Sequence, residues 1–145
     1  MTKTEDLERV LQTEAALAEA LARVVAQKQE AIVGFKGEDL GTLTLREEEL
    51  VKPLRQLEEE RVRIASDIAG AGAPSIALRD LTGLMTKKEA DRIAPHAARL
   101  RTAVQRVVRM NDQNRVLLQQ SLRYVRETLR IITDNHTKQL IDQKM

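Results

Sequence analysis

Apolar residues recur at steps of three and four positions over three long stretches of the chain, which is the spacing of one face of an α-helix. The stretches cover approximately residues 4–33, 43–68 and 87–132. The glycine-rich segment 34–41 predicts a turn between the first two, so these helices are expected to run antiparallel. The pattern indicates long helices and argues against a β-rich fold.

Turn and capping residues divide the second and third stretches. Pro53 predicts a bend or a helix start, because proline lacks the amide proton and crowds the carbonyl four residues earlier. A segment rich in glycine and alanine then ends the second helix, and residues 75–81 predict a short helical turn. Thr86 and Glu89 match a capping box, so the third long helix is expected to begin at Lys87.

The third stretch carries an apolar line, here called the main seam, whose rhythm does not slip. Its members are Ala97, Leu100, Val104, Val107, Asn111, Asn114, Leu118, Leu122, Val125, Leu129 and Ile132. This continuity predicts one long helix through Asn111, despite Pro95 near its start. Residues 133–145 contain turn formers and only one apolar pair, Leu140 and Ile141, and are expected to be a mobile tail or short helix.

These segments predict an all-α fold, an antiparallel up-and-down bundle of long helices with one short connecting helix. The bundle is expected to form one domain over residues 1–132, followed by the tail at 133–145. Composition agrees with this fold, because Phe35 and Tyr124 are the only aromatic residues and aliphatic helix formers dominate.

Composition also limits the chemistry and the cellular compartment. The absence of cysteine excludes disulfides and thiolate metal sites and is compatible with the reducing cytoplasm. No run of about 18 apolar residues occurs, so neither a signal peptide nor a membrane span is expected.

Charge is unevenly distributed along the chain. Residues 1–60 hold 8 Lys and Arg against 14 Asp and Glu, a net charge of −6, whereas residues 61–145 hold 16 against 8, a net charge of +8. A basic half suggests nucleic acid, but stacking aromatics and zinc-finger spacing are both missing. Packing of the acidic half beside the basic half is therefore favoured over nucleic-acid binding.

Candidate catalytic groups do not converge. Neither His96 nor His136 follows a glutamate by three positions, as a di-iron bundle requires. The acidic runs 47–49 and 58–60 place consecutive carboxylates about 100° apart around a helix, and no phosphate-binding GxxxxGK loop occurs. The sequence predicts no enzyme activity, no metal and no cofactor.

A second stripe lies roughly a quarter turn from the main seam and repeats every seven residues. Its members are Ala103, Met110, Leu117, Tyr124 and Ile131. Two interpretations are open. Either the last helix needs a broad face to pack against both earlier helices, or the stripe receives an amphipathic helix from a partner.

Asn111 and Asn114 occupy main-seam positions where the rhythm calls for apolar residues. A buried amide costs stability unless it finds hydrogen-bond partners. One interpretation is that the amides fix the register of helix pairing, because a slipped pairing leaves them unsatisfied. The other is that a partner, or a break in the chain, meets the amides.

The segment that contains these asparagines has the pattern Asn-x-x-Asn-Arg-x-Leu-Leu-x-x-Ser-Leu-x-Tyr over residues 111–124. This pattern resembles the signature segment of the FlgN family of flagellar type III export chaperones, with Leu118 in place of the usual isoleucine. The acidic turn at 37–40 and the leucine-rich second helix with its Glu60-Arg61 pair are similar to the family's first hairpin. The resemblance covers most of residues 5–132.

The resemblance implies a cytoplasmic chaperone that uses no nucleotide, binds the C-terminal helical segments of hook-associated junction proteins, prevents their premature association and delivers them to the export apparatus. It also implies that Tyr124 matches an aromatic residue that docks to the membrane export gate. The candidate partner-binding residues are Met110, Asn111, Asn114, Leu117, Ser121, Tyr124, Ile131, Leu140 and Ile141. The alternatives are a structural coiled-coil module that self-associates, including a homodimer without client, and a nucleic-acid accessory protein.

Overall fold

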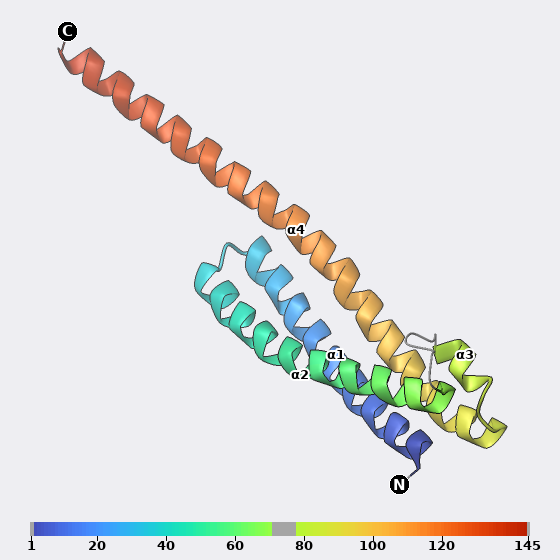
Figure 1. Ribbon diagram of the computed structural model, residues 1–145. Coiled ribbons are helices and arrows are strands. Elements are labelled where there is room, and N and C mark those ends of the chain that lie inside the picture. The colour runs from blue at the N-terminus through green and yellow to red at the C-terminus, as the bar shows by residue number, and fades with distance from the viewer. Residues whose placement is uncertain (1, 71–77, 145) are drawn as a thin grey trace.

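The computed structural model describes residues 2–70 and 78–144, which form four helices and no strand. The helices are α1 (Lys3–Val33), α2 (Gly37–Ala69), α3 (Leu78–Thr82) and α4 (Lys87–Lys144). Helix α2 runs back along α1, and α4 then runs in the same direction as α1 (Figure 1). The predicted all-α bundle of long helices with one short connecting helix is confirmed.

Helix α1 is the central element. Thr2 caps it by accepting a hydrogen bond from the Glu5 amide at 3.1 Å, and two acidic residues in the first turn suit the positive end of the helix dipole. Its sides pack against α2 and against α4, whereas α2 and α4 have no close backbone contact in the described part of the chain. Most of the buried residues therefore come from α1.

The turn between α1 and α2 is shorter than the sequence predicts. Gly34 ends α1, the Phe35 amide bonds to the Ile32 carbonyl at 3.2 Å, and the Lys36 amide bonds to the Ala31 carbonyl at 2.9 Å. This bonding is a Schellman motif, in which the residue after the cap adopts the left-handed conformation and is usually glycine. Here that residue is Phe35, with φ of 54°, at a cost of about 1 kcal/mol.

Helix α2 begins at Gly37, so the prediction of a turn across residues 34–41 is wrong in its extent. The acidic first turn of α2 favours this early start, because negative charge stabilises a helix N-terminus. Pro53 lies well inside α2 and does not start it. A bond of 2.6 Å between Lys28 and Glu47 ties α1 to α2 along the hairpin.

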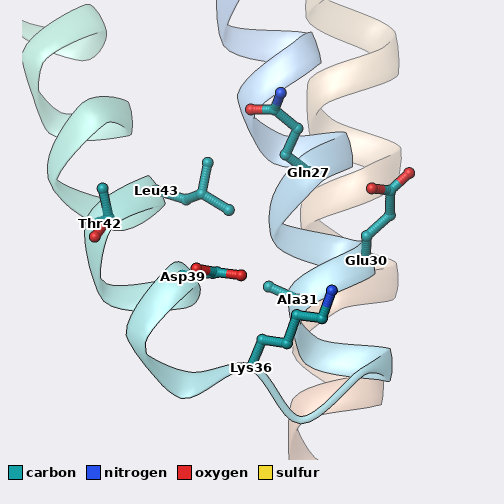
Figure 2. A pocket seen from close by; sticks show the side chains of 7 residues that line it. All are labelled: Gln27, Glu30, Ala31, Lys36, Asp39, Thr42 and Leu43. Atoms are coloured by element: carbon teal, nitrogen blue, oxygen red, sulfur yellow. The ribbon is translucent and has the colours of Figure 1, made fainter.

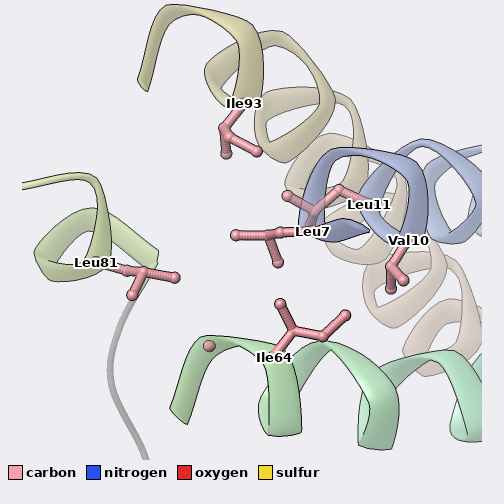
Figure 3. Close-up of a cluster of buried hydrophobic side chains, with 7 residues drawn as sticks. Leu7, Val10, Leu11, Ile64, Leu81 and Ile93 are labelled. Carbon is pink, nitrogen blue, oxygen red and sulfur yellow. The ribbon is translucent and has the colours of Figure 1, made fainter. Parts of the chain in front are cut away.

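All four helices meet in one apolar cluster near the start of α1 (Figure 3). Its buried members are Leu7, Val10, Leu11, Ile64, Ala65, Leu81 and Ile93. The predicted capping box beside this cluster is confirmed, since the Glu89 amide bonds to the Thr86 hydroxyl and the Thr86 amide bonds to the Glu89 carboxylate, both at 3.2 Å. The predicted short turn at 75–81 falls partly outside the described residues; the described helix there begins at Leu78.

Helix α4 is much longer than its partners. Its 58 residues span about 87 Å, whereas the 31 residues of α1 span about 46 Å. The helix continues through Thr133 to Lys144, so the segment expected to be a frayed tail or separate short helix is part of α4. No glycine or proline interrupts this segment, and the Thr137 hydroxyl donates to the Thr133 carbonyl at 3.0 Å. The division into a domain at 1–132 and a tail stays a prediction.

Candidate partner-binding surface on the last helix

The face of α4 that packs on α1 lies between the two predicted stripes. Among the described helices, the backbone of α4 comes close to those of α1 and α3 but not to that of α2. Its buried and half-buried positions along this face are Ile93, His96, Leu100, Ala103, Val107, Met110, Asn114, Leu117 and Ser121. They include members of both the main seam and the second stripe. The interpretation in which α4 packs against both earlier helices is confirmed in part, because α4 packs along α1 and also meets α2 through side chains in the apolar cluster that holds Ile64 and Ile93.

Polar pairs fix the register of α4 along α1. Arg92 lies 2.7 Å from the Glu8 carboxylate, and Arg99 pairs with Glu19. Farther along, the Gln29 side-chain amide donates to Gln113 at 3.2 Å. Glutamates of the acidic half thus pair with arginines of the basic half, as the charge distribution predicts.

Asn114 is the one amide of this face that is fully enclosed, with 6% of its surface exposed. Its Nδ2 donates to the Val25 carbonyl of α1 at 3.1 Å, while its Oδ1 has no hydrogen-bond partner in the described part of the chain. Asn111, one turn earlier, is half-buried. Asn114 therefore has a partner within the fold, through one half of its amide.

Beside the positions that pack on α1, α4 retains a line of exposed apolar residues. This line, here called the open flank, consists of exposed main-seam residues together with Val108: Val104, Val108, Leu118, Leu122, Val125, Leu129 and Ile132. Where it passes α2, it borders a cavity of about 320 Å³ that Leu21 of α1 and Leu54 of α2 also line. Exposed apolar surface of this continuity marks interaction sites in soluble proteins.

Beyond the hairpin turn, α4 extends away from the rest of the molecule (Figure 1). This overhang, residues 126–144, follows Tyr124, which contacts the turn itself. Its large apolar residues are all exposed and comprise Leu129, Ile131, Ile132, Leu140 and Ile141. The end of α4 extends beyond the other described helices, which leaves these side chains uncovered (Figure 1).

The nine predicted partner-binding residues fall into two groups. Those at the α1 interface are buried or half-buried and comprise Met110, Asn111, Asn114, Leu117 and Ser121. The others are exposed and comprise Tyr124, Ile131, Leu140 and Ile141. The second stripe is therefore packed in its first part and open in its second part. The binding roles of these residues stay predictions.

Sequence reasoning missed Phe35 as part of this surface. The Phe35 and Tyr124 rings, the only aromatic rings in the chain, lie with centroids 6.0 Å apart and planes inclined at 51°. This separation is typical of favourable aromatic pairs. The register of α4 on α1 brings the two rings together, and this register could not be read from the sequence. The rarity of aromatic residues was therefore the only signal in the sequence.

A polar pocket of about 310 Å³ lies on the other side of the hairpin turn, between α1 and α2 (Figure 2). Its lining combines Gln27, Glu30 and Ala31 of α1 with Lys36, Asp39, Thr42 and Leu43. Charges of both signs therefore share this small pocket. The described residues contain no cluster of three or more His, Cys, Asp or Glu side chains that could hold a metal ion.

Comparison with known proteins identifies a family. The family model described as FlgN protein matches residues 1–141. No curated protein and no solved structure matches. Among the described residues, no helix has the length and apolar character that crossing a membrane requires.

Proposed function

Because this chain belongs to the FlgN family, a family of flagellar export chaperones rather than enzymes, we propose that it acts in the cytoplasm as the chaperone of hook-associated junction proteins. In this proposal it binds the C-terminal helical segment of a client, prevents premature association and delivers the client to the type III export apparatus.

The observation that supports client binding is the unpartnered apolar surface of α4. A helix that is apolar along one side normally buries that side against another element. Here the open flank and the overhang leave theirs exposed, among them Leu122, Leu129 and Ile132. An amphipathic client helix with anchors at i, i+3, i+4 and i+7 would cover this surface.

Charge around the open surface favours an acidic client segment. Between residues 123 and 134, α4 carries three arginines, Arg123, Arg126 and Arg130, against two acidic residues, Glu127 and Asp134. All five side chains are exposed. Complementary charge of this kind accelerates encounter and fixes orientation more than it adds affinity.

The delivery step is assigned to Tyr124, whose ring is 62% exposed beside the client surface. A tyrosine at the edge of an apolar surface offers a large ring and a hydroxyl that can reach a partner's polar group. In this proposal Tyr124 docks to the cytoplasmic part of the export gate while the open flank holds the client.

The client role is tested by titrating the chain with a synthetic C-terminal segment of a junction protein. Leu129→Asp should weaken binding at least about tenfold, because it places a charge in the covered surface. The matched control, Gln120→Asp, adds the same charge on the opposite side of α4 and should leave affinity within about twofold. Equal effects of the two variants would refute binding through the open flank.

Light scattering of the same samples separates the proposal from self-association. The client segment should convert the chain, whether monomer or homodimer, into a one-to-one complex. A chain that keeps one oligomeric mass and ignores the segment would instead be a self-associating structural module.

A further inference from the structure

Phe35 occupies a backbone position at which a ring-bearing residue is unexpected. The turn after α1 needs one residue with positive φ, and this residue is Phe35 rather than its neighbour Gly34. Glycine enters that conformation without steric cost, whereas a bulky residue there is an outlier. Such strained conformations persist where the surrounding structure compensates for them, and they cluster at functional sites.

The use that the structure shows for this ring is contact with Tyr124. The Phe35 side chain is exposed over 60% of its surface, so it does not serve the hydrophobic core. Its ring meets Tyr124 from α4 at a centroid distance of 6.0 Å. It also forms one wall of an apolar pocket of about 180 Å³ that Ile32, Leu118 and Leu122 help to line.

We propose that Phe35 is a positioning residue for Tyr124, so that the docking surface is built jointly by the hairpin turn and α4. The proposal rests on the assignment of Tyr124 as the gate-docking residue. A tyrosine alone on an exposed helix samples several rotamers, and binding must then freeze one of them. The Phe35 ring restricts Tyr124 before the partner arrives and so lowers this entropic cost.

The turn makes this positioning precise because two backbone bonds hold Phe35 in place. The amides of Phe35 and Lys36 bond to the last carbonyls of α1, which ties the ring to a rigid helix end. The partner surface on α4 is held on α1 by Asn114 and the flanking pairs. Segments 89 residues apart in sequence therefore present one aromatic pair.

Phe35→Gly is the decisive variant. It removes the ring and supplies the residue that the left-handed position prefers, so melting temperature and helicity should stay equal or rise. Because the chain has one tyrosine, no tryptophan and no cysteine, near-ultraviolet circular dichroism in the tyrosine band reports Tyr124 alone. That band should weaken strongly, and affinity for the cytoplasmic domain of the gate should fall about three- to tenfold.

A double-mutant cycle separates positioning from an independent contact. In the Tyr124→Ala background, Phe35→Gly should cause almost no further loss of gate affinity, because its effect acts through Tyr124. Phe35→Tyr keeps a ring at the turn, so its gate affinity should equal that of the unchanged chain and exceed that of Phe35→Gly. Additive losses, or no recovery with Phe35→Tyr, would overturn the proposal.

The failure of this inference and the failure of the proposed docking role give different results. If Tyr124→Ala leaves gate affinity unchanged, Tyr124 is not the docking residue. The proposal that Phe35 positions it for docking is then wrong as well. If Tyr124→Ala weakens docking while Phe35→Gly changes neither affinity nor the tyrosine band, the docking role stands and only the positioning inference is overturned.

Discussion

At the residue scale, two buried polar residues, Asn114 and Glu14, are the positions where substitutions should change stability in a characteristic way. Each is more than nine-tenths buried, and each has one partner across a helix interface. Buried polar groups contribute to stability only when their hydrogen-bonding capacity is satisfied. The Oδ1 of Asn114 has no partner among the described residues, whereas Glu14 is paired with Arg61, so the two sites respond differently to substitution.

Replacement of Asn114 by leucine should raise stability by about 1 kcal/mol. The variant removes an amide oxygen without a partner in the described chain, and the Val25 carbonyl keeps its own bond within α1. Apolar burial increases, while the penalty on slipped pairing of α4 is lost. Thermal denaturation measures the gain, and Asn111→Leu at the half-buried position serves as control with a smaller effect. A loss of several kcal/mol would show that the whole amide is satisfied in solution.

The Glu14 and Arg61 pair, joined at 2.9 Å between α1 and α2, should make stability depend on pH. Burial raises the pKa of Glu14 above its usual 4.5, although Arg61 acts in the opposite direction. Because the folded-state pKa is the higher one, the contribution of Glu14 to stability is fully present below pH 4.5 and is lost as pH rises through the folded pKa.

Removal of Arg61 should raise the pKa of Glu14 further, so that the loss of stability with rising pH continues to higher pH. Arg61→Met leaves the carboxylate buried without its cation, so the variant should lose about 2 kcal/mol at neutral pH and recover part of it on acidification toward pH 4.5. Urea denaturation across this range measures the deficit. The double variant Glu14→Gln with Arg61→Met should show no such pH dependence, and a deficit that is constant in the single variant would contradict the account.

At the element scale, α4 is one continuous helix with two different environments. Its first part is held by α1 and closes the core, as Ile93, Ala103 and Asn114 show. Its last part extends beyond the other described helices, and its large apolar side chains are exposed (Figure 1). Isolated helices of this length are marginal in water, so the overhang should open far more often than the packed part.

Deletion of residues 133–145 should therefore leave the melting temperature of the bundle almost unchanged. The described part of this segment extends beyond the other helices (Figure 1), and surface changes away from special features usually fall within about 0.5 kcal/mol. Hydrogen exchange of the full-length chain should show fast exchange over the overhang and slow exchange near Ala103. A large drop in melting temperature after deletion would show that the end of α4 folds back onto the bundle.

At the scale of the whole molecule, ion pairs between α1 and α4 neutralise part of the charge. Arg92 and Arg99 of the basic half pair with Glu8 and Glu19, whereas Arg123, Arg126 and Arg130 near the overhang are exposed. The same pairing removes basic surface that nucleic acid would need.

Raising salt from about 50 to 500 mM should slow client association about tenfold while the melting temperature changes little. The arginines near the overhang are exposed and screened by salt, whereas the bundle is held mainly by apolar burial and its exposed ion pairs have small net value. Stopped-flow mixing with the client segment measures the rate. An association rate that is independent of salt would exclude charge steering by these arginines.

Local signals in the sequence predicted the helices well, but the sequence did not predict how helices distant in sequence pack on one another. The capping box at Thr86 and the unbroken rhythm through Asn111 are local, and both are confirmed. Which side of α4 packs on α1 could not be predicted, because both stripes are apolar and the choice depends on α1. The early start of α2 was missed because Phe35, rather than a glycine, adopts the left-handed position. Its contact with Tyr124 depends on the same long-range register.

The central place of α1 sets an order of events during synthesis. The side of α1 that packs on α2 finds its partner within the hairpin, whereas the side that packs on α4 must wait for residues up to about Leu117. At a translation rate of about 5–20 residues per second, roughly 4–17 s separate the completion of α1 from the completion of its second interface. The nascent chain therefore carries a half-covered helix for several seconds, with Leu11, Ala18 and Val25 on a helix whose cover is incomplete. The newly made chain is exposed to aggregation in that interval, because the side of α1 that packs on α4 is still uncovered.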